Sequence, residues 1–86
     1  MNLYFQNSQG KMRVIAKISD DISIEEARAE VAKQIRQFCD QRHFKIYYTR
    51  VWNAVVDGIP MTQFDVGSHT EFFFTDQILY HPEKGV

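Results

Sequence analysis

The stretch "RVWNAVVDGIPMTQFDV" (50–66) decides the fold, because two apolar runs meet at Asp57-Gly58. Both residues tolerate the positive φ that a type I′ turn requires, so the dipeptide predicts a β-hairpin with a two-residue loop. A loop of that length fixes the register and places Arg50 opposite Asp65. Such a cross-strand pair of opposite charges stabilises a sheet by ~0.2–1 kcal/mol, which favours this register over one shifted by a residue.

The register also divides the surrounding stretch (44–74), which is rich in aromatic and β-branched residues, between two sides of a sheet. Gly67-Ser68 predicts a second turn, which returns the chain through "HTEFFF" (69–74); a longer loop around Gly67, Ser68 and His69 is the alternative and would change the pairing of that strand. One side is expected to pack on a helix and collects Phe44, Ile46, Tyr48, Trp52, Ala54, Val56, Ile59, Met61, Phe72 and Phe74. The other side is expected to stay uncovered and carries Tyr47, Val51, Val55, Phe64 and Phe73.

The segment "SIEEARAEVAKQIRQFCDQR" (23–42) predicts a helix from about Ser23 to Gln41. Ser23 followed by Glu26 forms a capping-box pattern, in which the hydroxyl accepts from a free backbone N–H of the first turn. Apolar residues three and four apart form a single stripe, which needs a sheet to pack on. The stripe comprises Ile24, Ala27, Val31, Ile35 and Phe38.

The segment "KMRVIAKIS" (11–19) alternates and predicts a half-buried strand. Its apolar side is expected to carry Met12, Val14, Ala16 and Ile18, with Ile15 as an exception. The expected class is α+β in the order β-α-β-β-β, with one helix on a four-stranded, mostly antiparallel sheet. The crossover through the helix is expected to be right-handed if it joins parallel strands. The short segment "QILY" (77–80) is expected either to pack on an edge or to fold back over the uncovered side.

The string "NLYFQ" (2–6) resembles the recognition site of the tobacco etch virus protease, which is used to remove tags. The resemblance implies that residues 1–10 are derived from a tag, and that residues 11–86 form a single small domain. The alternative interpretation is an N-terminal strand, which the spacing of Leu3 and Phe5 would suit.

The composition excludes several classes of function. Lys plus Arg is 10 and Asp plus Glu is 11, a net charge of −1, which argues against a nucleic-acid partner bound mainly through phosphates. No apolar run approaches the ~20 residues of a membrane-spanning helix. A single cysteine, Cys39, forms no internal disulfide, so a reducing, cytoplasmic location is the simpler expectation.

Two clusters carry candidate chemistry, and each has a simpler explanation. Cys39 and His43 are four residues apart, as in a thiol nucleophile with its base, but Cys39 borders the apolar stripe and no third group orients the pair. Asp65, His69 and Glu71 could supply three metal ligands, but turn and cross-strand roles account for them. No catalytic, cofactor-binding or metal-binding residue is therefore assigned.

The uncovered side of the sheet is the main functional hypothesis, because an exposed apolar patch on a small domain usually marks a contact surface. The expected interaction residues are Tyr47, Val51, Val55, Phe64 and Phe73. They predict a non-enzymatic protein-interaction module that binds an unknown partner or a second copy. Small accessory proteins of phages or mobile elements are an analogy from size alone. The alternatives are single-stranded nucleic-acid binding through stacking aromatics, and a small metal- or thiol-dependent enzyme.

Overall fold

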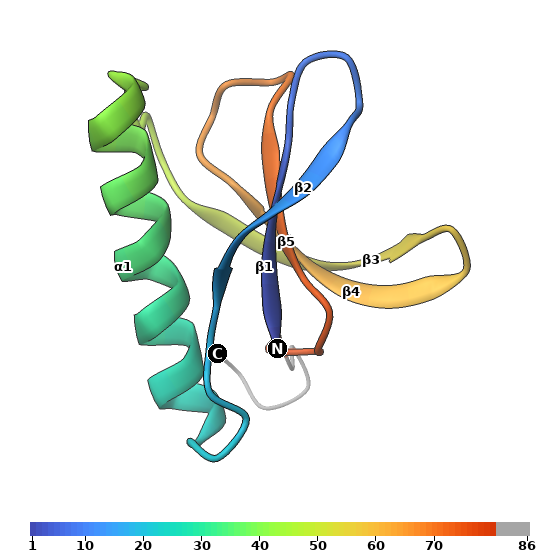
Figure 1. Ribbon diagram of the computed structural model, residues 1–86. Coiled ribbons are helices and arrows are strands. Elements are labelled where there is room, and N and C mark those ends of the chain that lie inside the picture. The colour runs from blue at the N-terminus through green and yellow to red at the C-terminus, as the bar shows by residue number, and fades with distance from the viewer. Residues whose placement is uncertain (81–86) are drawn as a thin grey trace.

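The computed structural model describes residues 1–80 of the chain, as one helix and a five-stranded antiparallel sheet (Figure 1). This confirms the α+β class and corrects the expected number of strands. The elements in chain order are β1 (Asn2–Gln6), β2 (Met12–Lys17), α1 (Ile24–Arg42), β3 (Arg50–Val56), β4 (Ile59–Asp65) and β5 (Phe72–Thr75).

The strand order is β2-β1-β5-β4-β3, so β1 lies inside the sheet between β2 and β5. A sheet that begins at residue 11 is therefore wrong, because residues 2–6 form one of its strands. The derivation of residues 1–10 from a tag stays a prediction. Leu3 is fully buried and Phe5 is 5% exposed. The alternation of these two residues matches the alternative interpretation, an N-terminal strand.

The ends of α1 follow from their local sequence. The Ser23 hydroxyl accepts a hydrogen bond from the backbone N–H of Glu26 at 3.1 Å, as the capping pattern predicts. At the other end His43 adopts a left-handed conformation with φ of 58°, and the Phe44 N–H donates to the carbonyl of Cys39. This turns the chain away from the helix axis and toward the start of β3.

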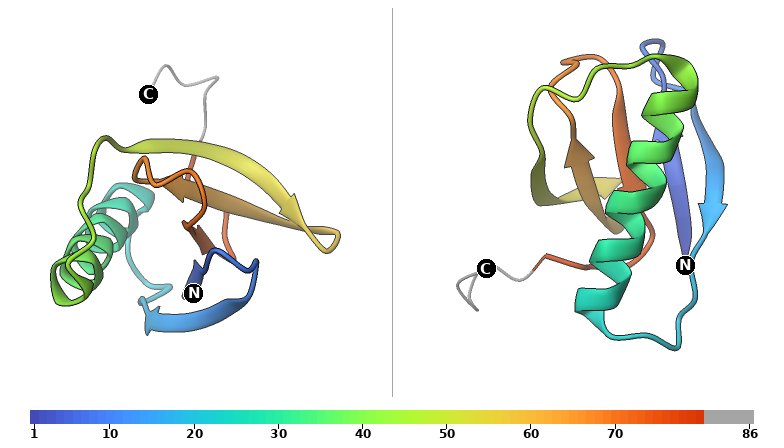
Figure 2. Two further views of the ribbon diagram at one scale, coloured as in Figure 1. Left: turned by 90° about the horizontal axis from the view of Figure 1, so that it is seen from above. Right: turned by 90° about the vertical axis from the view of Figure 1, so that its left-hand side faces the viewer.

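The helix lies on one side of the sheet, which we call the helix face; the opposite side is the outer face (Figure 2). One row of directly paired residues crosses all five strands on the helix face: Arg13, Phe5, Phe73, Phe64 and Val51. The three phenylalanines of this row join the core with Ala27, Val31, Ile35 and Phe38 of the helix stripe. The remaining predicted member of the stripe, Ile24, is 44% exposed and is not part of this core. The Phe38 ring meets the rings of Phe5 and Phe73 at centroid distances of 4.7 and 5.6 Å.

A bulge in β2 explains why Ile15 interrupts the alternation. Leu3 pairs with Ala16 but Tyr4 pairs with Val14, so Ile15 is the extra residue. Ile15 and Ala16 pack against the core, whereas Val14 lies on the outer face and is 45% exposed. The expectation that Val14 and Ala16 share one side is therefore wrong, because the extra residue between them places the two side chains on opposite faces.

The β3–β4 register is confirmed in full, including Arg50 opposite Asp65. Asp57 and Gly58 both have positive φ, at 51° and 80°, as the two-residue turn requires. No ion pair joins Arg50 to Asp65, however. The Arg50 guanidinium lies 4.9 Å from the centroid of the Tyr48 ring instead.

The segment after β5 closes the core on the helix face. Leu79 is 2% exposed and belongs to the core cluster. Its N–H donates to the Thr62 hydroxyl, and the hydroxyls of Thr62 and Thr75 both donate to the Gln77 carbonyl, at 2.8 and 2.9 Å. Within the described residues, no helix is long and apolar enough to cross a membrane.

Candidate contact surfaces

The five predicted interaction residues do not share one uncovered side. Phe64 and Phe73 are 8% and 1% exposed and lie in the core beneath α1, and Val51 is partly buried against that core. Tyr47 and Val55 are exposed, at 64% and 72%. The expected side was wrong because alternation separates the two faces of a sheet but does not say which one the helix covers. Leu3 and Phe5, left out of the expected sheet, belong to the face that α1 covers.

The outer face carries a second complete row, formed by Val14, Tyr4, Phe74, Gln63 and Trp52. No member of this row is charged, and none belongs to the core cluster beneath the helix. The Trp52 indole N–H donates to the Gln63 side-chain oxygen at 3.1 Å, so both of these polar atoms are engaged within the row. Phe74 at the centre of the row is 4% exposed, Tyr4, Gln63 and Trp52 are partly buried, and Val14 is 45% exposed. The row is therefore a largely apolar, partly accessible surface that α1 does not cover.

The β3–β4 hairpin extends this outer face beyond the rest of the sheet (Figure 1). β5 pairs with β4 only from Thr62 to Phe64, so the end of the hairpin has no third strand beside it. Ile59 on the outer face is 51% exposed, and Val55 on the helix side of the hairpin is 72% exposed. Both sides of the projecting tip are thus apolar and accessible.

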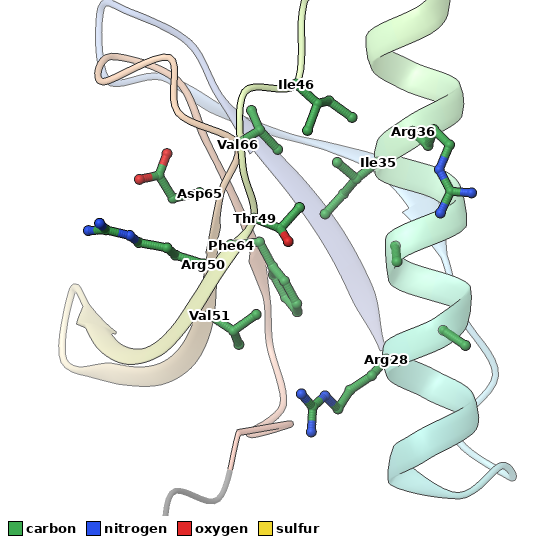
Figure 3. A pocket seen from close by; sticks show the side chains of 12 residues that line it. Arg28, Ile35, Arg36, Ile46, Thr49, Arg50, Val51, Phe64, Asp65 and Val66 are labelled. Atoms are coloured by element: carbon green, nitrogen blue, oxygen red, sulfur yellow. The ribbon is translucent and has the colours of Figure 1, made fainter. Parts of the chain in front are cut away.

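A cavity of about 380 Å³ opens between α1 and the first residues of β3 (Figure 3). Its apolar lining includes Ile35 from the helix, Ile46 from the preceding loop, and Val51 and Phe64 from the sheet. These side chains point into the space, and Arg28 extends toward its lower end. The remaining lining residues are Ala29, Ala32, Arg36, Thr49, Arg50, Asp65 and Val66.

Tyr47 and Tyr48 lie in the irregular segment before β3 and pack closely against Gly67. Gly67 has φ of +93°, and a Cβ atom there would approach the Tyr47 Cβ to 2.9 Å. The backbone N–H groups of both tyrosines donate to the Val66 carbonyl. The Lys45 ammonium lies 5.0 Å from the centroid of the Tyr47 ring. This corner therefore combines exposed aromatic rings with positive charge.

Cys39 and His43 are not arranged for nucleophilic chemistry. Cys39 is fully buried, and burial, with smaller contributions from Asp40 and Glu71, raises the pKa of its thiol. A raised pKa disfavours the thiolate, which is the reactive form. His43 is exposed at the end of α1, where its backbone serves as the C-cap.

The acidic and histidine residues near the second turn do not converge on an ion site. Asp65 is 6% exposed, and its two oxygens accept from the Gly67 N–H at 2.8 Å and from the Tyr48 hydroxyl at 3.5 Å. His69 is exposed in a left-handed turn conformation. Across residues 1–80, no group of three His, Cys, Asp or Glu side chains is placed to hold a metal. Asp65 instead orders the turn.

No protein-family model, curated protein or solved structure gives a significant match to this chain. The function is therefore argued from the surfaces themselves.

Two features escaped the sequence interpretation. The outer-face row is not evident from the sequence, because alternation groups Val14 with Ala16 on one apolar side and the tag resemblance excludes Tyr4 from the expected sheet. The cavity beside β3 brings together Arg28, Ile46 and Phe64, from three separate segments of the chain. Helical periodicity does place Arg28 and Arg36 off the apolar stripe, but nothing in the sequence indicates that they border a cavity.

Proposed function

We propose that this chain is a non-enzymatic protein-contact module that binds a second copy of itself through the outer face of its sheet. The observation that carries the proposal is the uncharged outer-face row on the side that α1 does not cover (Figure 2), where Val14 is 45% exposed and Tyr4 and Trp52 are partly exposed. Protein interfaces concentrate aromatic residues and exclude charge at their centres.

Three properties favour a second copy as the occupant. An uncharged surface brings no like charges together when it meets its own symmetry mate across a two-fold axis. The net charge of −1 also gives little repulsion between copies. A small domain gains burial from such an association, because its own core buries only a modest share of the chain's surface.

Single-stranded nucleic acid is the rival occupant of this face. Tyr4 and Trp52 offer rings for base stacking, but the cations on this face, Lys17 and Arg50, lie at its margins. Stacking proteins combine their aromatic rings with a positively charged groove that tracks the backbone. The uncharged centre of the outer face therefore favours protein contact over nucleic acid.

Light scattering over a range of concentrations tests the proposal. Wild-type protein is expected to show a dimer mass that falls toward the monomer on dilution. Ile59→Lys places a charge on the outer face of the hairpin and is expected to give a monomer at all concentrations. Val55→Lys is the matched control, because it adds the same charge to an exposed site on the opposite side of the same hairpin.

Three results would contradict the proposal. A wild-type monomer at every concentration excludes the second copy as the occupant. Loss of the dimer in Val55→Lys with its retention in Ile59→Lys places the contact on the other side of the hairpin. Tight, salt-sensitive binding of labelled single-stranded oligonucleotides, abolished by Trp52→Ala, supports the rival function.

A further inference from the structure

We infer that the cavity between α1 and β3 binds an extended peptide segment of a partner protein, which inserts an apolar side chain and carries acidic residues beside it. This site is distinct from the outer-face row, because none of the five residues of that row lines the cavity and its apolar lining belongs to the helix face, to α1 and to the loop before β3. The inference therefore does not depend on self-association.

The backbone of β3 provides the docking edge. β3 is the last strand of the sheet, so one side of its backbone has no strand partner among the described residues. Such an edge accepts an extended peptide as an additional strand, with main-chain hydrogen bonds supplying affinity. Thr49, Arg50 and Val51 line the cavity, so a peptide paired with the start of β3 would lie along its opening.

The cavity provides a place for an anchor side chain. Alternate side chains of an added strand point to the helix face, where Ile35, Ile46 and Phe64 form an apolar lining (Figure 3). The volume of about 380 Å³ lies within the range of pockets that enclose compact ligands. A branched aliphatic or aromatic residue therefore fits the chemistry of the site.

The charges at the cavity select acidic neighbours for that anchor. Arg28 and Arg36, two turns apart on α1, both line the cavity. Among residues 1–80, the only ion pair joins the Met1 amino group to Asp20, so neither arginine has a carboxylate partner there. Asp65 is the only acidic lining residue, and its oxygens already accept from Gly67 and Tyr48. Guanidinium groups bind carboxylates with well-defined geometry, which favours Asp or Glu in the peptide.

Selection from a displayed library of short random peptides tests this inference on the intact protein. Enriched peptides are expected to carry an aliphatic or aromatic residue flanked by Asp or Glu. A synthetic copy of the dominant peptide should shift the amide NMR signals of Thr49 to Val51 and of Ile35. Added salt is expected to weaken its binding, since the arginines lie at an accessible rim.

Charge reversal at the cavity supplies the decisive comparison. The double variant Arg28→Glu and Arg36→Glu is expected to lower the peptide affinity by roughly tenfold or more. Lys33→Glu is the matched control on the same helix, because Lys33 is exposed and does not line the cavity. Circular dichroism spectra confirm that each variant is folded.

Several outcomes would overturn the inference. They are a selection that enriches no peptide over a blank surface, an enriched motif without acidic residues, and equal losses of affinity in the double variant and in Lys33→Glu. Signal shifts confined to Tyr4, Phe74 and Trp52 would move the binding site to the outer face. Because Ile59→Lys alters only the hairpin tip, it should leave peptide binding unchanged even if it abolishes dimerisation.

Discussion

The two faces of the sheet are built from the same strands but are used differently. Across the strands, one row reads Arg13, Phe5, Phe73, Phe64 and Val51, and the other reads Val14, Tyr4, Phe74, Gln63 and Trp52. Both rows are rich in aromatic residues, yet only the first lies beneath α1. The comparison teaches that hydrophobicity alone does not identify the core of a small domain. The helix covers Phe5, Phe64 and Phe73. On the outer face Phe74 is also buried, and Tyr4 and Trp52 are the aromatic residues that remain partly accessible for contact.

A buried charge in β1 should break the comparison most severely. Leu3 and Tyr4 are adjacent but belong to opposite faces, and Leu3 is fully buried. Leu3→Asp places a carboxylate in the core at a cost that exceeds much of the ~5–15 kcal/mol stability of a typical domain, so the chain is expected to be unfolded. Tyr4→Asp is expected to remain folded. Amide NMR signal dispersion distinguishes the folded from the unfolded state. A folded Leu3→Asp variant would contradict the placement of β1 inside the sheet.

Truncation of neighbouring phenylalanines in β5 should sharpen the comparison. Phe73 is 1% exposed beneath the helix, whereas Phe72 is half-buried on the outer face. Phe73→Ala is expected to lower the free energy of unfolding by ~3–5 kcal/mol, as for other buried phenylalanines. Phe72→Ala is expected to cost about 1–2 kcal/mol, since less apolar area leaves water on folding. Urea denaturation at low protein concentration measures both, and equal losses would contradict the distinction between faces.

Substitution of Gly67 tests whether the turn between β4 and β5 needs a residue without a side chain. Gly67→Ala combines a left-handed backbone with a close approach to Tyr47, and is expected to destabilise the fold by about 1–3 kcal/mol. Gly10→Ala is the control, because Gly10 also has positive φ but no atom lies within 4 Å of the position that a Cβ atom would take. Thermal denaturation should show the larger loss at Gly67. If both variants lose the same stability, contact with Tyr47 contributes nothing.

The smallest expected effect concerns the pH dependence of the free energy of unfolding, to which Cys39 of α1 contributes. Burial raises the folded-state pKa of the Cys39 thiol above its ordinary value of 9.0. The resulting stability is fully present below the unfolded-state pKa and is lost as the pH rises through the folded-state value. Stability measured on either side of about pH 9 should therefore fall more in the wild type than in Cys39→Ala. Identical pH profiles would show that ionisation of the thiol is not linked to folding.

The sequence predicted local features well, because local interactions determine them. The Ser23 cap, the apolar stripe of α1 and the Asp57-Gly58 turn each depend on residues close together in the chain. The hairpin turn also set the whole β3–β4 register, since each pair follows from the one before it. These features placed the chain in the α+β class without knowledge of its tertiary contacts.

The remaining features depend on contacts between distant segments. β1 pairs with β5 across almost the whole described chain, and no local pattern predicts that pairing. The bulge at Ile15 places Val14 and Ala16 on opposite faces, so simple alternation assigned Val14 to the wrong face. The candidate cavity likewise exists only once α1 lies beside β3. Sequence reasoning therefore found the apolar surfaces but assigned the helix to the wrong one.

The position of β1 has a consequence for how the protein acquires its structure. Its partner β5 is made last, so β1 must wait with one edge unpaired until nearly all of the described chain has been synthesised. Closing so long a loop is entropically costly and slows folding. A nascent chain is therefore expected to remain sensitive to proteases and chaperones until β5 emerges from the ribosome, and then to complete its sheet in one cooperative step.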